Sequence, residues 1–130
     1  NLSNDTMESI SIDNNPELNT LEGLSGITSL SGDLSITGNP LIESLIGLEL
    51  LDSVGGLLDL NVNSSLQNID ALGNLNHVDS NIRIIENENL SDFCGLQTLL
   101  TTGGPSGNLS ISENAYNPSG QDIIDGNCSQ

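Results

Sequence analysis

The chain has 130 residues, and 18 acidic residues against a single lysine or arginine give it a formal net charge of −17. A surface this acidic repels the phosphates of nucleic acids and the anionic headgroups of lipids, so neither is expected as a partner. The length is that of one domain, and no apolar run is long enough to cross a bilayer, so membrane insertion is not expected either.

Short β-strands are the first elements that the sequence predicts. Pairs of aliphatic residues separated by one polar residue recur along the chain, which places both members of a pair on one face of a strand. The predicted strands are marked by the pairs Ile10/Ile12, Leu34/Ile36, Leu58/Leu60, Ile82/Ile84 and Leu109/Ile111.

An asparagine stands three positions after the second member of each pair. The asparagines at 15, 39, 63 and 87 are therefore 24 residues apart, and the fifth arrives three residues late, after an insertion around residues 103–107. Side-chain amides can bond backbone groups that a bend would otherwise leave buried and unpaired, so we expect these asparagines to be structural. The expected asparagine column consists of Asn15, Asn39, Asn63, Asn87 and Asn114.

The segment after each asparagine carries leucine or isoleucine at nearly every third position, a period that fits neither a strand nor an α-helix. A repeat with one strand and extended or 3₁₀-like sides accounts for it. A small residue precedes the third of these aliphatic positions in each repeat, namely Gly23, Gly47, Ala71 and Gly95. We expect a mostly β fold, a β-solenoid of about five 24-residue coils that start near residues 10, 34, 58, 82 and 109, within a repeat domain at residues 1–114.

The last residues, 115–130, break with the repeats and are expected to form a C-terminal cap, because repeat arrays need a polar end. Ser119 is the expected N-cap of a short helix that ends near Gly126. In that helix Ile123 and Ile124 are expected to cover the last coil.

The two cysteines, Cys94 and Cys128, are expected to form a disulfide, because the C-terminal segment must fold back on the fourth coil to cover its core. A structural bridge of this kind implies an oxidising compartment. Two free thiols or a metal-binding pair are the alternatives, although the chain has no CxxC spacing.

These repeats resemble the leucine-rich-repeat relatives known as receptor L domains. Ordinary leucine-rich repeats carry L-x-x-L-x-L-x-x-N-x-L, whereas here the asparagine begins N-x-x-L, as at Asn87–Leu90, and a G-L follows, as at Gly47–Leu48. The resemblance covers roughly residues 8 to 114 and implies a right-handed, mostly β solenoid used as an extracellular recognition surface. The ending N-P-x-x-Q-D-I-x-x-G-x-C-S also resembles that of secreted surface repeat proteins of Bacteroidetes-type bacteria.

Candidate partner surfaces lie where the repeats break their own pattern. The only cation, Arg83, is expected beside Asp59 on the outward strand face, with two exposed aliphatic residues nearby. The candidate partner face is Leu57, Asp59, Asn61, Arg83 and Ile85, and a modest cross-strand ion pair is the simpler interpretation. The second repeat also places aliphatic residues where sister repeats are polar or small, which predicts an apolar patch for a partner or for weak self-association, made of Leu41, Ile46 and Leu50.

The sequence predicts no catalytic group, cofactor or resident metal. The single histidine, His77, has no nucleophile at a defined spacing, and the carboxylates are not paired on one strand as a glycosidase would need. One acidic patch has two interpretations, weak calcium binding or an ordinary solvated turn. It consists of Glu86, Glu88 and Asp92.

We therefore expect a non-enzymatic recognition or adhesion module of a secreted or cell-surface protein, with a protein or glycan ligand of unknown identity. The alternative is a surface-active solenoid such as an ice-binding protein, which would need an unbroken row of small hydroxyl side chains. Charges interrupt the corresponding outward row, which reads Ser11, Ser35, Asp59, Arg83 and Ser110.

Overall fold

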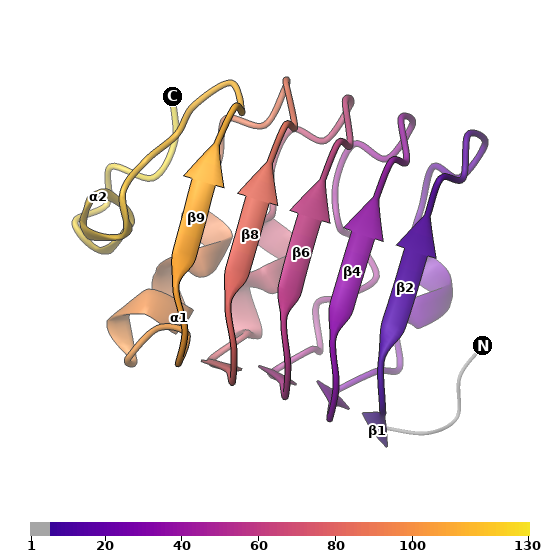
Figure 1. The fold of residues 1–130 in the computed structure, drawn as a ribbon, viewed down its shortest axis with the longest axis horizontal. Helices are drawn as coiled ribbons and strands as arrows, with labels where there is room; N and C mark the ends of the chain where they lie inside the picture. The colour runs from indigo at the N-terminus through magenta and orange to yellow at the C-terminus, as the bar shows by residue number, and fades with distance from the viewer. Residues whose placement is uncertain (1–5) are drawn as a thin grey trace.

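The computed structural model describes residues 6–130, so the first five residues of the expected repeat domain lie outside the described part. Five parallel strands form the larger of two sheets, in the order β2-β4-β6-β8-β9 (Figure 1). Their bounds are β2 Ile10–Asp13, β4 Leu34–Thr37, β6 Leu58–Asn61, β8 Ile82–Ile85 and β9 Leu109–Ser112. The chain is thus β-rich, with each predicted strand in the place that its aliphatic pair indicates.

The register of this sheet follows the asparagine spacing. Ile10 pairs with Leu34, which in turn pairs with Leu58, so that neighbouring strands are 24 residues apart. Ile82 pairs with Leu109, because the insertion in the fourth repeat lies between these two strands and leaves the register intact. Equivalent residues of successive repeats therefore lie side by side.

A second parallel sheet, in the order β1-β3-β5-β7, is built from two-residue strands. These are β1 Thr6–Met7, β3 Ser29–Leu30, β5 Ser53–Val54 and β7 His77–Val78. The aliphatic pattern does not predict them, because two residues are too few to show an alternation. They precede the turn that leads into the larger sheet and hold successive repeats together on this side.

Short helical turns complete the repeats. The 3₁₀ turns η1 Glu22–Leu24, η2 Asp70–Asn74 and η3 Cys94–Leu96 lie in the segments where 3₁₀-like sides are expected. The α-helix α1 Gln97–Thr101 in the fourth repeat is not predicted, because the sequence offers no N-cap signal for it. The residue before it is Leu96, whose side chain makes no cap hydrogen bond. The C-terminal helix α2 Gly120–Ile124 begins after Ser119, whose hydroxyl accepts from the Asp122 N–H at 3.0 Å.

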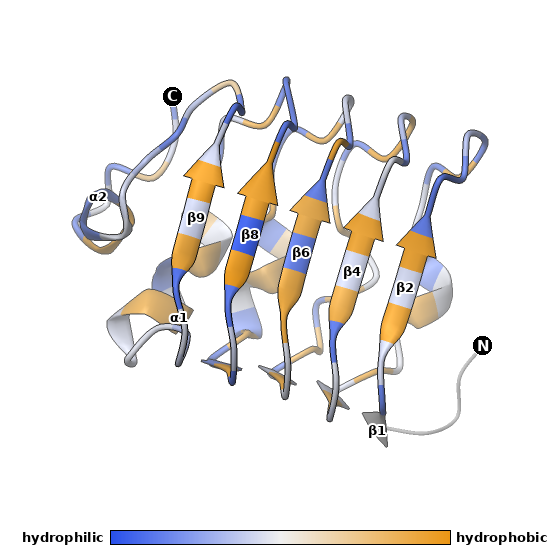
Figure 2. Cartoon of the chain, in the orientation of Figure 1, coloured by the Kyte–Doolittle hydropathy of each residue, from blue (hydrophilic) through white to orange (hydrophobic). Residues whose placement is uncertain are grey.

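The core is aliphatic and lies between the two sheets and the helical turns. Figure 2 shows hydrophobic and hydrophilic residues alternating along β4 and β6 of the larger sheet, where the hydrophobic members are those that face inward. Leu34, Ile36, Leu58 and Leu60 are fully buried. Phe93 joins the same core, with its ring centroid 6.5 Å from that of Tyr116 in an edge-on contact.

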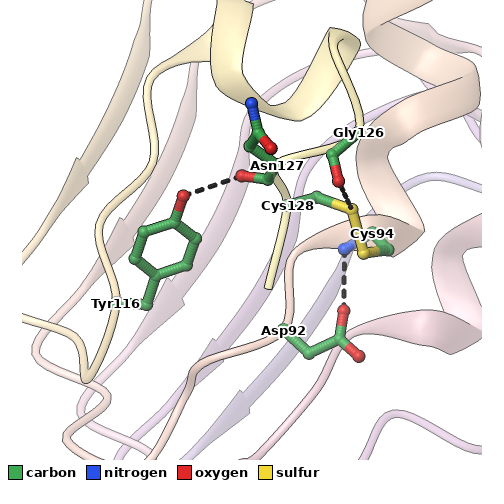
Figure 3. The surroundings of a disulfide bond; sticks show 6 residues. All are labelled: Asp92, Cys94, Tyr116, Gly126, Asn127 and Cys128. Atoms are coloured by element: carbon green, nitrogen blue, oxygen red, sulfur yellow. Dashed lines mark hydrogen bonds between the residues drawn. A yellow bond between two sulfur atoms is a disulfide. The ribbon is translucent and has the colours of Figure 1, made fainter. Parts of the chain in front are cut away.

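The predicted disulfide is confirmed, because Cys94 at the start of η3 is bonded to Cys128, which is 34 residues further along the chain (Figure 3). The backbone N–H of Phe93 also donates to the Cys128 carbonyl at 2.7 Å, so the C-terminal segment lies against the fourth repeat. Ile123 is buried, as expected for a cap, but Ile124 is exposed. Adjacent residues of an α-helix point in directions about 100° apart, so only one of the two covers the core.

Gly47 occupies a position where any side chain would overlap the preceding repeat. A Cβ atom there would overlap the carbonyl oxygen of Leu21, and the backbone φ of +121° is one that L-residues rarely adopt. We expect Gly47→Ala to lower the free energy of unfolding by about 3 kcal/mol or more, measured by urea denaturation.

Gly23 is the matched control, since it stands 24 residues earlier at the same place in the first repeat and a Cβ atom there meets nothing within 4 Å. Gly23→Ala is expected to change stability by less than about 0.5 kcal/mol. Equal losses in the two variants would show that contact between the repeats is not what selects glycine at position 47.

Candidate functional site

The asparagine column is a chain of hydrogen bonds that runs from one repeat to the next. The Oδ1 atom of Asn63 accepts from the backbone N–H of Asn39 at 3.1 Å, and the Oδ1 of Asn87 accepts from the Asn63 N–H at 2.9 Å. From Asn39 onward, the Nδ2 atom of each asparagine also donates to a carbonyl of the preceding repeat, as Asn63 does to the Ile36 carbonyl at 2.9 Å. Each of these side chains thus satisfies two backbone groups of the preceding repeat.

Burial makes these bonds structural. Asn39, Asn63 and Asn87 are 0% exposed. A buried polar group without a partner costs free energy, so side chains of this kind are held in place for the fold and are not available to a ligand. The column therefore sets the register of the repeats, and its side chains are not candidates for ligand binding.

The candidate partner face lies on the outward side of the larger sheet, where the side chains between the core pairs form a row across the strands. Pairing places Ser35 opposite Asp59, Asp59 opposite Arg83, and Arg83 opposite Ser110. Two charged residues of opposite sign therefore interrupt a row of serines at its centre, on the neighbouring strands β6 and β8.

Asp59 is the best-held residue of this face. Its Oδ1 atom accepts from the Nδ2 of Asn61 at 2.5 Å, and its Oδ2 lies 3.7 Å from the Nη1 of Arg83. The Asp59 side chain is only 15% exposed, whereas that of Arg83 is 47% exposed. The guanidinium therefore forms a loose ion pair with the carboxylate and keeps its hydrogen-bond donors for other groups.

The two aliphatic residues of this face are half-buried, and the expectation that they are exposed is wrong. Leu57 precedes β6, and its backbone N–H donates to the Oδ1 of Asp33 at 2.7 Å, which holds it against the neighbouring repeat. Ile85 ends β8, and its N–H donates to the Oδ1 of Asn61 at 3.1 Å. The face therefore has a polar centre with partly covered apolar edges.

Burial raises the pKa of Asp59 above the usual value of an aspartate, and the charge of Asp13 acts in the same direction. Arg83 and the hydrogen bond from Asn61 oppose this rise without cancelling it. A carboxyl group whose pKa is raised on folding binds its proton more tightly in the folded state. At neutral pH the ionised group therefore disfavours folding, and that penalty disappears as the pH falls through the folded-state pKa.

We expect Asp59→Asn to change the pH dependence of stability in one direction. As the pH falls from 7 toward 4, the wild type should gain free energy of unfolding relative to the variant, because only the wild type has this carboxyl group to protonate. Urea denaturation at several pH values measures the difference in stability between the two proteins. Protonation of the other carboxylates relieves charge repulsion in both proteins alike, so it cancels in this difference. A wild type that loses stability relative to the variant over this range would contradict the raised pKa.

The candidate apolar patch is exposed but divided. Leu41, Ile46 and Leu50 are 46%, 51% and 55% exposed. Leu41 and Ile46 line a hollow of about 350 Å³ together with the acidic residues Glu22 and Glu43, between the first and second repeats. Leu50 is not among its lining residues. The structure thus brings two of the three residues to one hollow with an acidic rim.

The acidic residues considered for calcium do not gather at one place. Glu86 and Glu88 line a shallow hollow of about 290 Å³ with Glu113. Asp92 is not one of its lining residues, and its Oδ1 atom accepts from the Cys94 N–H at 3.0 Å. Within residues 6–130 no group of three or more histidine, cysteine, aspartate or glutamate side chains is placed to hold a metal ion. His77, at the start of β7, has its Nε2 2.6 Å from an Asp79 carboxylate oxygen, and both side chains are largely exposed.

Val62 is an exposed aliphatic residue that the sequence pattern does not predict. It follows β6, is 48% exposed, and has a φ of +56°, a left-handed conformation that is unusual for a β-branched residue. Asn14, Glu86 and Glu113 share this conformation at the equivalent place, directly before an asparagine of the column. The glycine at position 38, one repeat earlier than Val62, is the signal that could have revealed a left-handed turn there.

Comparisons with protein-family models, with curated proteins and with solved structures found no match to this chain. None of the helices in the described part of the chain is long and apolar enough to cross a membrane.

Proposed function

We propose that the chain is a non-enzymatic recognition or adhesion module of a secreted or cell-surface protein. On this view its fold is a right-handed leucine-rich-repeat solenoid like those of receptor L domains, with residues 1–114 as the repeats and 115–130 as the cap. The 24-residue register, the buried asparagines and the 3₁₀ turns support this assignment.

The observation that carries the proposal is the centre of the outward strand face. A half-exposed guanidinium lies 3.7 Å from a mostly buried carboxylate, in a chain that has no other lysine or arginine. An exposed arginine side chain can bind carboxylate, phosphate or carbonyl groups through its planar set of donors. The ligand we expect is therefore a protein or glycan that presents an acceptor group to Arg83.

The disulfide supports an extracellular location. A structural bridge between Cys94 and Cys128 forms and persists in oxidising compartments. The bridge ties the C-terminal cap to the fourth repeat and leaves the outward face of the larger sheet uncovered (Figure 1).

The hollow lined by Leu41 and Ile46 is the second candidate contact surface. Its acidic rim, with Glu22 and Glu43, favours a partner that carries basic residues beside apolar ones, and it disfavours weak self-association of a chain with a net charge of −17. Two measurements on the wild type and on the variant Leu41→Ser, Ile46→Ser, Leu50→Ser test these two roles. Light scattering tests self-association, and a binding assay tests contact with a partner. A monomeric wild type and unchanged partner binding by the variant would exclude this patch.

Protein and glycan arrays probed with the wild type and with Arg83→Ala test the main proposal. We expect the wild type to retain at least one ligand and Arg83→Ala to lose it. Ser110→Ala is the matched control, since Ser110 is exposed, lies in the same row on the next strand, and is expected to keep the ligand.

Equal binding by the wild type and Arg83→Ala would contradict recognition through the strand face. Chemical conversion of a bound ligand would contradict a non-enzymatic role. Thermal hysteresis in a freezing experiment would instead favour the ice-binding alternative, which the charges of Asp59 and Arg83 disfavour.

A further inference from the structure

The two ends of the asparagine column differ. At the C-terminal end, Asn117 closes the column, because its Oδ1 accepts from the Asn114 N–H at 2.9 Å and from the Asn114 Nδ2 at 3.1 Å. At the N-terminal end, Asn15 donates through both its N–H and its Nδ2 to the Oδ1 of Asn39. Within residues 6–130 no donor reaches the Oδ1 of Asn15, which is the atom that every later asparagine uses to bind the repeat before it.

The core is open at the same end. Ile12, Leu18 and Leu24 are only partly buried, whereas the equivalent residues of the second repeat, Ile36, Ile42 and Leu48, are fully buried. The three partly buried residues line an apolar hollow of about 370 Å³ together with Asn15. Strand β2 is also the edge of its sheet, and an edge strand presents backbone groups that can pair with a further strand.

The glycine positions mark the same face. Cβ atoms at Gly47 and Gly95 would overlap carbonyl oxygens of the preceding repeat, those of Leu21 and Ile69. The equivalent place in the first repeat is also a glycine, Gly23, although nothing in the described chain lies within 4 Å of a Cβ there. The third repeat has Ala71 at this place, so every repeat carries a small residue there. The first repeat shares this feature on the side where the described chain has no neighbour.

We propose that the N-terminal end of the array is a docking surface for one further repeat of the same pattern. Its strand would pair in parallel with β2, and its asparagine would donate its N–H and Nδ2 to the Oδ1 of Asn15. Its aliphatic side chains would fill the hollow over Ile12, Leu18 and Leu24. The interface would thus continue the one that already joins each described repeat to the next.

A second copy of this chain does not fit this surface. In a head-to-head arrangement the two Asn15 Oδ1 atoms would face each other, and both are acceptors. A head-to-tail arrangement needs an open C-terminal end, but there Asn117 closes the column, and the cap is tied to the fourth repeat through the Cys94–Cys128 bond. Each copy also carries a net charge of −17, so two copies repel one another.

Duplication of residues 32–55 between Met7 and Glu8 of the full chain tests the proposal. Gly55 of the copy then precedes Glu8 as it precedes Gly56 in the parent, so the register of the strands is kept. We expect the extended protein to unfold in one transition at a higher urea concentration than the parent. We also expect the amides of β2 to exchange more slowly with deuterium.

Asn15→Ala, made in both proteins, separates docking from simple tethering. In the extended protein its destabilisation should rise to that of Asn39→Ala, because Asn15 would then bind the added repeat. In the parent its effect should remain smaller. An added repeat that exchanges like an unfolded chain, or an Asn15→Ala effect that is the same in both proteins, would overturn the proposal, as would a dimeric parent in light scattering.

Discussion

Replacing Asn63 by alanine is expected to lower the free energy of unfolding by about 3 to 5 kcal/mol. The Asn63 side chain is fully buried, accepts from the Asn39 N–H and donates to the Ile36 carbonyl. Alanine would leave both backbone groups buried without a partner, and each such group costs about 1 to 3 kcal/mol. Urea denaturation followed by circular dichroism measures the loss.

Asn74→Ala is the control for this experiment. Asn74 is exposed, and its Nδ2 atom makes a hydrogen bond of 2.6 Å with the Glu49 carbonyl on the surface. Its replacement is expected to cost no more than about 1 kcal/mol. If Asn63→Ala were no more costly than Asn74→Ala, the column would not hold the repeats together.

Removing the disulfide by the double replacement Cys94→Ala, Cys128→Ala is expected to cost about 3 to 4 kcal/mol. The bond closes a loop across a sequence separation of 34 residues and ties the cap to the fourth repeat, so its loss frees the unfolded chain and loosens the cover over the core. Urea denaturation of the oxidised wild type and of the double variant measures the difference.

Reduction provides the matched control for the disulfide. A reducing agent should lower the stability of the wild type to nearly that of the double variant and should leave the double variant unchanged. The contrary result, an oxidised wild type no more stable than the variant, would mean that the cap is held by its packing and hydrogen bonds alone.

Periodic features of the sequence predict periodic features of the structure. The spacing of Asn39, Asn63 and Asn87 gives the strand register directly, because each asparagine must lie over the next for its side chain to reach the backbone. The need to cover the last repeat likewise predicts the pairing of Cys94 with Cys128.

Local features that are not periodic escape this reasoning. Helix α1 has no counterpart in the other described repeats, and the strands of the smaller sheet are too short to leave a pattern. The outward direction of a side chain is predictable, as at Asp59 and Arg83, but the depth of its burial is not. Leu57 is half-buried, and its backbone N–H donates to the Asp33 carboxylate, a contact that no spacing indicates.

Hydrogen exchange at the backbone amides of Asn39, Asn63 and Asn87 tests the central claim, that buried asparagine side chains join each repeat to the next. These amides donate to side-chain oxygens of the following repeat at 3.1, 2.9 and 3.0 Å. We expect all three to exchange only through global unfolding, with the same free energy as urea denaturation gives. Exchange as fast as at the exposed Gly103 would contradict the claim.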